Sequence, residues 1–559
     1  MEFADLIKIS RIDNVRVRRA GKPCIEATVA VTGHHLIISS SDTKDSTDRE
    51  MWLLHRGILS VSKETESNRS GTLLLKYKDM RVFNLDIIGQ DCLTALTTSL
   101  QALSNVEEQT SSYPFFYNPG FKGLEDGWCL FRPEEEYCKL IKGAESTWRV
   151  SRVNHEFSVC ATYGKLLIVP TNLTDSQILT VAKHRIGGRF PVPCYLHNVK
   201  NNSIPLVRGS YTVAGWRNGE DEKLMAGIRG SNRKGFIICI HHDKIKMAGG
   251  KSEYDTVYAQ WKRVNLRLPS LSELRESLNN LSAACNDPGN DKWISKLASA
   301  HWLAHVKDVL NAACLAAQLI EKENAPVVVI EQEAADLSLI LVSLAQIILN
   351  PDSRTLHGLE ALIERDWIQG GYKFWTRHGS SSPDRETSPV FLLFLDAVFQ
   401  IYTQFPYSFE FTDRLLVVLG DHSFSSPFGT FLSDCEKERC SYSVREQTVS
   451  LWSYLNQVEI LSSMLNSLYI PNNSVIWPSV APMSIILWTS YYLRWVQDQN
   501  NYTYERRKIT EIIERNKTAK LQALRLRREL QELQDEALSL GLLCTEDTER
   551  RDSDNSVQT

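Results

Sequence analysis

Three carboxylates lie in one short loop of this 559-residue chain, between an apolar strand-like run and an apolar helical run. The loop reads Glu331-Gln332-Glu333-Ala334-Ala335-Asp336-Leu337, with Val327 to Ile330 before it and Ser338 to Leu349 after it. Carboxylates can donate or accept protons in catalysis. This loop contains no cysteine, and no Ser-His-Asp or metal-ligand pattern elsewhere supplies a nucleophile. The segment is therefore placed for chemistry but lacks the group that would attack a substrate.

The composition excludes several classes of protein. Hydrophobic residues make up 43% and charged residues 23% of the chain, as in ordinary globular proteins. The formal net charge of −4 gives no global attraction to nucleic acid. The 12 cysteines are scattered, which predicts free thiols rather than a metal site, even at Cys435 and Cys440. Because the N-terminus has no signal-like apolar core, we expect a cytoplasmic protein. We also expect no metal and no cofactor.

Residues 1–105 have the pattern of a small β-rich domain. Short alternating runs are separated by polar turns, and an amphipathic helix at about 91–103 follows them. Strands closed by one C-terminal helix predict a pleckstrin-homology-like β-sandwich. The expected strands are Ile25–Val31, Leu36–Ser39, Trp52–Leu54, Thr72–Tyr77 and Val82–Asp86.

Residues 120–498 predict a large α/β domain. Strand-like runs such as Ile237–Ile240 and Val327–Ile330 alternate with helical runs such as Trp293–Ile320. The whole chain is therefore expected to be a multidomain α+β protein.

Residues 508–542 predict a coiled coil, and residues 543–559 a disordered tail. Glycine and proline almost vanish there, and apolar residues recur at alternating spacings of three and four. The alternative is one amphipathic helix packed on its own domain. The predicted seam consists of Ile509, Ile512, Asn516, Ala519, Ala523, Leu526, Leu530, Leu533, Ala537 and Leu540.

Long collinear stretches of this chain resemble the myotubularin family of phosphoinositide phosphatases. The segment Ile25 to Ile37 resembles the β-hairpin of the GRAM domain that opens these proteins. The resemblance covers about the whole chain, so it implies a GRAM domain, a cysteine-phosphatase-like domain and a coiled coil. The stretches that carry it in the large domain include Trp148-Arg149, Gly188-Arg189-Phe190-Pro191-Val192, Leu362-Ile363-Glu364-Arg365-Asp366-Trp367, Ser388-Pro389-Val390-Phe391 and Phe428-Gly429-Thr430-Phe431-Leu432.

The resemblance fails at the catalytic loop, where active members carry His-Cys-Ser-Asp-Gly-Trp-Asp-Arg. Glu331 stands in the place of the nucleophilic cysteine and Leu337 in that of the arginine. A carboxylate cannot form the cysteinyl-phosphate intermediate, and it could compete for the amides that hold phosphate. Ala334 replaces a glycine whose conformational freedom lets the loop curl. Asp336 keeps the place of a family acid.

A second departure lies at Cys239 to Gly250, which lacks the arginine and asparagines that active members carry near the pocket. His241 and His242 in this region are expected to be surface residues rather than new catalysts. The resemblance therefore predicts a catalytically inactive protein.

Inactive myotubularins bind active members through the coiled coil, which implies a regulatory subunit in a heterodimer. A homodimer is the other state that this helix allows. The resemblance places such a protein in the cytoplasm, peripherally on endosomes or the endoplasmic reticulum. The alternative is a phosphoinositide-binding adaptor acting through the GRAM-like domain, whose basic residues include Arg16, Arg18, Arg19, Lys76, Lys78 and Arg81.

Overall fold

The computed structural model describes residues 3–40, 49–65, 70–121, 126–199, 202–213, 218–230, 234–242, 258–287, 291–379 and 386–496, with scattered helical positions between 515 and 540. The chain divides into two compact units, Met1–Val496 and Gln497–Thr559. The larger unit contains the two predicted folded domains, and each unit is described by itself.

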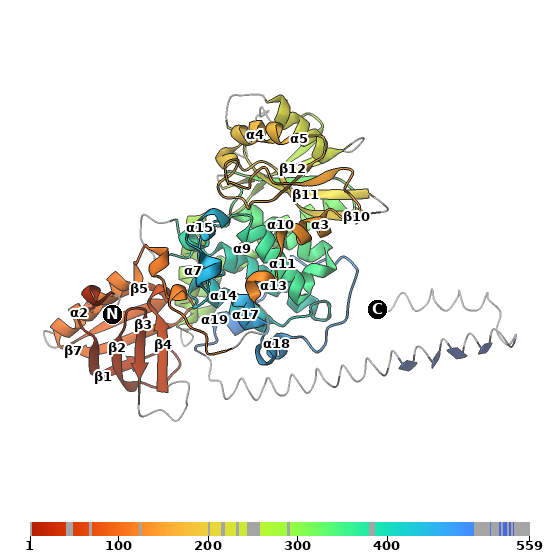
Figure 1. The fold of residues 1–559 in the computed structure, drawn as a ribbon. Coiled ribbons are helices and arrows are strands. Elements are labelled where there is room, and N and C mark those ends of the chain that lie inside the picture. Colours follow the sequence, from red (N-terminus) through yellow and green to blue (C-terminus); the bar gives the residue numbers. More distant parts are fainter. Residues whose placement is uncertain are drawn as a thin grey trace. The chain divides into compact units, whose positions relative to one another are not determined.

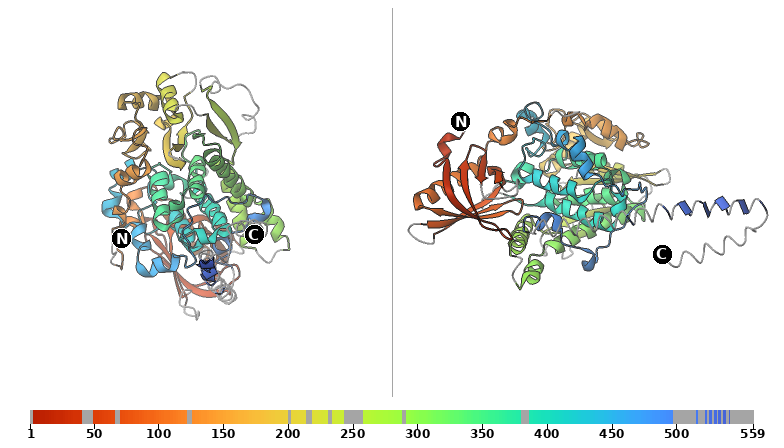
Figure 2. Two further views of the ribbon diagram at one scale, coloured as in Figure 1. Left: turned by 90° about the vertical axis from the view of Figure 1, so that its right-hand side faces the viewer. Right: turned by 90° about the horizontal axis from the view of Figure 1, so that it is seen from below.

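The N-terminal domain is one strongly twisted antiparallel sheet of seven strands, closed by a helix (Figures 1 and 2). The sheet order is β4-β3-β2-β1-β7-β6-β5, and helix α2 (Gln90–Ser104) packs on β5, β6 and β7. Every second side chain of a strand enters the core, as in β2, where Ile25, Ala27 and Val29 are buried. The strands are β1 (Arg11–Arg18), β2 (Ile25–Val31), β3 (His35–Ser39), β4 (Glu50–Leu54), β5 (Ile58–Thr65), β6 (Ser70–Tyr77) and β7 (Val82–Ile88).

The β-rich domain with one C-terminal helix is confirmed, but two strands were missed in the sequence. Strand β1 carries charges at alternate positions, and a bulge at Asn14, with φ 58°, interrupts its period. Strand β5 also contains a bulge in its pairing with β6. An inserted residue shifts the side chains to the other face, so a search for strict alternation fails at both strands.

The large domain is built around a five-stranded sheet in the order β10-β11-β14-β12-β13. Strand β14 (Val327–Glu331) is central and runs parallel to both β11 and β12. Its residues alternate between two cores, since Val327 and Val329 enter one and Val328 and Ile330 the other. The other strands are β10 (Val192–Val199), β11 (Asn202–Ser210), β12 (Gly235–His241) and β13 (Trp261–Arg267), with a separate pair β8 (Trp148–Ser151) and β9 (Leu167–Pro170).

Helices cover both faces of this sheet, as an α/β fold requires (Figure 1). Helices α9 and α10 pack on the face of β11 and β14 that belongs to the larger core, and α4 and α5 lie over the opposite face. The helices are α3 (Pro133–Leu140), α4 (Asp175–His184), α5 (Gly219–Arg229), α7 (Leu271–Cys285), α8 (Trp293–Ser299), α9 (Trp302–Glu321), α10 (Leu337–Leu349), α11 (Leu356–Leu362), α12 (Phe374–Arg377), α13 (Val390–Gln404), α14 (Asp413–Phe424), α15 (Glu436–Ser441), α16 (Val444–Gln447), α17 (Leu451–Leu455), α18 (Val458–Met464) and α19 (Thr489–Tyr492).

The mixed helix and sheet architecture is confirmed, but the single helical run predicted at Trp293–Ile320 is wrong. It divides into α8 and α9 at His301, whose φ is 59°. A left-handed residue reverses the chain direction and ends a helix. Helix α9 is long and apolar enough to span a membrane, but half of it is buried in the domain, as in the core helix of a globular protein.

The junction between the two domains depends on a buried lysine. Lys78, which is 6% exposed, donates from Nζ to the carbonyl oxygen of Arg56 at 2.6 Å and to that of His378 at 2.9 Å. The Arg56 guanidinium stacks over the ring of Trp375, 3.4 Å from its centroid. Arg81 lies over the ring of Trp495 and pairs with Asp79.

This geometry corrects part of the basic surface considered for lipid contact. Lys78 and Arg81 point into the junction, and Arg18 pairs with Asp86 at 2.7 Å. Arg16 and Lys76 are exposed. Lys78 and Arg81 are therefore engaged in the junction, whereas Arg16 and Lys76 remain on the surface.

In the C-terminal unit, the described positions from 515 to 537 are helical and the described position 540 lies in a turn. The seam residues Ile509, Ile512, Asn516, Ala519 and Ala523 lie outside the described residues. Leu526, Leu530, Leu533 and Leu540 are 58%, 57%, 65% and 66% exposed, and Ala537 is half-buried.

Lys78→Met should lower the free energy of unfolding by roughly 1–3 kcal/mol, because two buried carbonyls lose their donor. Lys76→Met, two residues earlier and exposed, is the matched control and should change it by less than about 0.5 kcal/mol. Thermal unfolding of both variants measures the difference. Equal midpoints would show that Lys78 does not stabilise the junction.

Candidate functional site

The loop between β14 and α10 lies at the carboxyl end of the central parallel strand. Ligand sites of open α/β sheets form at such edges. Strand β14 ends at Glu331 and α10 begins at Leu337, so the five residues between them must turn the chain within one short loop. The first backbone N–H groups of α10 have no partner within the helix and point into the loop.

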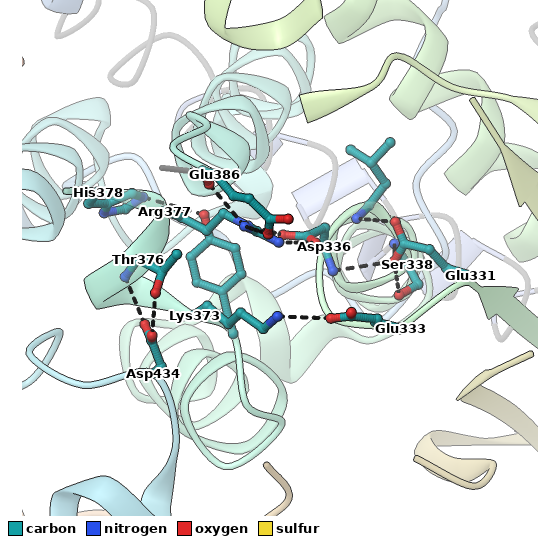
Figure 3. A network of polar contacts seen from close by, with 12 residues as sticks. Glu331, Glu333, Asp336, Ser338, Lys373, Thr376, Arg377, His378, Glu386 and Asp434 are labelled. Carbon is teal, nitrogen blue, oxygen red and sulfur yellow. Dashed lines mark hydrogen bonds and ion pairs between the residues drawn. The ribbon is translucent and has the colours of Figure 1, made fainter. Parts of the chain in front are cut away.

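The Glu331 carboxylate accepts those N–H groups (Figure 3). Oε1 accepts from the Leu337 amide at 3.0 Å, and Oε2 accepts from the amides of Asp336 at 3.3 Å and Ser338 at 3.1 Å. The Ser338 hydroxyl also donates to Oε2, at 2.7 Å. Glu331 is 4% exposed, so a buried charge is balanced by four donors and by the positive end of the helix dipole.

The loop remains curled although alanine replaces the expected glycine. Ala334 has φ 51°, in the left-handed region that alanine rarely adopts. Ala334 therefore adopts a conformation that a glycine would adopt more easily. Two buried arginines hold this conformation: Arg189 donates to the Ala334 carbonyl oxygen at 2.8 Å, and Arg208 donates to the same oxygen.

Both arginines are almost completely buried, at 3% and 1% exposure, and their described hydrogen bonds go to carbonyl and hydroxyl oxygens. They share a second acceptor, the Gly370 carbonyl oxygen, and lie over the ring of Tyr163. Burial lowers the pKa of Arg189, and the Arg208 guanidinium lowers it further. This arginine pair supports the loop from the side of the core.

Gly370 and Gly371 leave room for the two arginines to approach the backbone. A Cβ at Gly371, whose φ is 76°, would lie 2.0 Å from the Thr162 carbonyl oxygen and 3.0 Å from Nη1 of Arg189. Glycine is therefore required there by both conformation and space.

Asp336 is held by an ion pair rather than placed for proton transfer (Figure 3). Its two carboxylate oxygens accept from Nε and Nη2 of Arg377, each at 2.8 Å. Arg377 also bonds Glu386, through Nη1 at 2.9 Å. Burial by itself would lower the pKa of Arg377, but the hydrogen bonds and charge of Asp336 raise it. The carboxylate has both oxygens occupied by a guanidinium.

The remaining loop residues divide between solvent and core. Gln332 and Glu333 are exposed, and Glu333 pairs with Lys373 at 2.8 Å. Ala335 and Leu337 are buried, and the Leu337 side chain belongs to the large core beneath the loop. The side chain at position 337 therefore offers no donor to the site.

A cavity of about 470 Å³ opens in front of the loop. Helix α7 contributes its first turn, and the loop and the segment after α12 form the other walls. The residues that line it are His242, Ser270, Leu271, Ser272, Arg275, Glu331, Gln332, Glu333, Asp336, Arg377, Glu386 and Thr387.

The second departure from the family is described only in part, because residues 243–250 lie outside the described residues. His242 lines the cavity, with Nδ1 3.4 Å from the Leu268 carbonyl oxygen. His241 lies at the end of β12 and contacts Tyr211 and Asn265. Cys239 is buried in the sheet.

No cysteine is among the described residues that line the cavity, and the amides of Asp336, Leu337 and Ser338 face the Glu331 carboxylate. No group of three or more acids, histidines or cysteines among the described residues is arranged to hold a metal ion.

Sequence reasoning missed Arg189, Arg208 and Arg377, which support the loop from other elements. Arg189 lies in the run Gly188 to Val192, which carried part of the family resemblance without a role. A charged residue in an otherwise apolar run, next to two glycines, was the available signal.

Comparison with known proteins agrees with this architecture. Residues 112–440 match the family profile of the myotubularin-like phosphatase domain, and residues 11–104 match the GRAM domain of the MTMR6-9 group. The chain is 43% identical to myotubularin-related protein 9 of Homo sapiens over 550 residues, covering 96% of this chain and 99% of the relative. The corresponding protein of Mus musculus is 42% identical over the same shares. Phosphatidylinositol-3,5-bisphosphate 3-phosphatase MTMR2 of Mus musculus is 35% identical over 388 residues, which is 66% of this chain and 59% of that protein.

Ala334→Gly should raise stability by about 0.5–1 kcal/mol, because relief of a left-handed alanine outweighs the added freedom of the unfolded chain. Ala335→Gly is the matched control, since Ala335 is equally buried but has no positive φ. That variant should lower stability by about 1 kcal/mol. Thermal unfolding distinguishes them, and shifts of the same sign would contradict the strain at Ala334.

Proposed function

The chain belongs to the myotubularin family, and we propose that it is a catalytically inactive member that regulates active members by forming heterodimers through its C-terminal helix. The observation that carries the proposal is the Glu331 carboxylate on the amides of α10. A cysteine phosphatase needs a thiolate at this position and free amides for the phosphoryl oxygens.

The loss of function is confined to the chemistry, while the fold around it is retained. The sheet is complete, the loop is curled and the cavity is open. We infer that a protein that keeps this fold without a nucleophile functions by binding a partner. This supports a role as a regulatory subunit rather than a role as an enzyme with other catalytic residues.

The C-terminal helix is the surface that best suits a partner of the same kind. Leu526, Leu530 and Leu533 fall at alternating spacings of four and three, and more than half of each side chain is exposed. Exposed leucines at these spacings are typical of the contact face of a coiled-coil helix. Alanines at 519, 523 and 537 thin this seam, so a partner with larger side chains opposite them would bind better than a second copy.

The relatives indicate which lipids such a heterodimer would act on. MTMR2 is a phosphatase for phosphatidylinositol 3,5-bisphosphate, and MTMR7 of Homo sapiens, which is 29% identical to this chain over 510 residues, is a phosphatase for phosphatidylinositol 3-phosphate. We propose that this chain raises the stability or activity of such a partner on the cytoplasmic surface of endosomes or the endoplasmic reticulum. The lipid-adaptor alternative is weaker, because Lys78 and Arg81 serve the domain junction.

The purified chain should release no phosphate from phosphatidylinositol 3-phosphate or phosphatidylinositol 3,5-bisphosphate. Loss of one anion-stabilising donor lowers kcat by about 10²–10³, and here the nucleophile is absent as well. Phosphate release is measured beside MTMR2 as the positive control, on protein free of any active relative. Release above the buffer blank would overturn the proposed inactivity.

Replacing Leu526, Leu530 and Leu533 together with glutamate should weaken association with an active myotubularin at least about 100-fold, because three apolar seam contacts become buried charges. Arg525→Glu with Glu532→Lys is the matched control, since both positions lie outside the seam. Co-purification with tagged MTMR2 and MTMR7 measures the association. Wild-type yield from the triple variant would place the contact on another surface.

A further inference from the structure

The Glu331 carboxylate has the contacts that a bound oxyanion would have. It is an anion, it is 4% exposed, and it accepts three successive backbone amides and one hydroxyl at the start of a 13-residue helix. Amides at a helix N-terminus bind phosphate and carboxylate by the same hydrogen bonds and the same dipole. The chain therefore supplies its own anion to a site built for one.

We propose that Glu331 is a permanent internal substitute for a bound phosphate group, which keeps the loop folded without ligand and closes it to phosphate and other tetrahedral oxyanions. This goes beyond the lack of activity, because a loop without a nucleophile could still bind and sequester a phosphorylated ligand. If this proposal failed, the proposed inactivity would still stand, since inactivity does not depend on whether the loop is open to phosphate.

Geometry and charge both exclude phosphate from the amides of this loop. One set of amides cannot serve two anions, because Oε1 already accepts from Leu337 and Oε2 from Asp336 and Ser338. A phosphate dianion beside the carboxylate would also be repelled within a partly desolvated cavity. Lys373 and Arg377 add no free positive charge, since each is already paired, with Glu333 and Asp336 respectively.

Removal of the carboxylate should leave a usable oxyanion site. The arginine pair Arg189 and Arg208 holds the loop through the Ala334 carbonyl oxygen and does not contact Glu331, so the curl has a second support. The freed donors would face a cavity of about 470 Å³, which is large enough for a phosphate ion. Thr387 lines the same cavity, and its buried Oγ1 has no hydrogen-bond partner among the described residues.

The experiment compares the full-length chain with Glu331→Ala and Glu333→Ala. The second variant is a matched control, because it removes the same charge two residues away from an exposed side chain that bonds Lys373 rather than the amides. Thermal unfolding is measured in sodium phosphate, sodium sulfate and sodium chloride at equal ionic strength.

Glu331→Ala should unfold at a lower temperature than wild type in chloride. It should regain stability in phosphate and sulfate in proportion to the logarithm of their concentration, as expected for a ligand of the native state. Wild type and Glu333→Ala should show only the smaller general stabilisation that phosphate and sulfate give to folded proteins. A Glu331→Ala protein that does not respond to phosphate overturns the proposal, and so does an equal response from wild type or from Glu333→Ala.

Glu331→Gln and Glu333→Gln decide the question if the alanine variant does not fold. The glutamine has nearly the shape of the glutamate but no charge, and its NH₂ cannot accept the amides. Glu331→Gln should therefore lower the unfolding temperature in chloride, while Glu333→Gln should not. Equal unfolding temperatures would show that the loop does not need an anion at position 331.

Discussion

The carboxylate of Glu331 and the first amides of α10 form the contact on which the arrangement of this loop depends. A charge buried to 4% exposure persists in a protein only when donors surround it, and here the donors are backbone groups that a helix start leaves without partners. The carboxylate thereby gains hydrogen-bond donors, and the amides gain an acceptor. Strand β14 must end at Glu331 and α10 must begin at Leu337 for the side chain to reach these amides.

The same loop is held from its other side by positive charge. Arg189 and Arg208 both donate to the Ala334 carbonyl oxygen, so the loop lies between an anion that accepts its amides and two cations that donate to its carbonyl. Both contacts are possible because the N–H groups of residues 336–338 face Glu331, whereas the C=O group of Ala334 faces the two arginines. Ala334 is kept at a positive φ by this support and not by its own preference.

The N-terminal domain is physically continuous with this site. Lys78 bonds the carbonyl oxygen of His378, and the preceding residue, Arg377, holds Asp336 of the loop. Burial lowers the pKa of His378 to about 3, so its ring stays neutral beside Lys78, Arg56 and Arg377. A chain of contacts therefore joins the GRAM-like domain to the loop.

The sequence alone determined the order of the domains, most of the strands of the N-terminal domain, the absence of the cysteine and the arginine, and the spacing of the exposed leucines. These follow from periodicity and residue type, which are local properties of the chain. It did not determine that Glu331 would turn back onto the amides, that Ala334 would curl, or that Lys78 and Arg81 would face inward. The partners of the loop and of Lys78 are Arg189, Arg208, Arg377 and His378, which are distant in the chain. Only the packing of β11, α12, the segment before β10 and the loop brings them together.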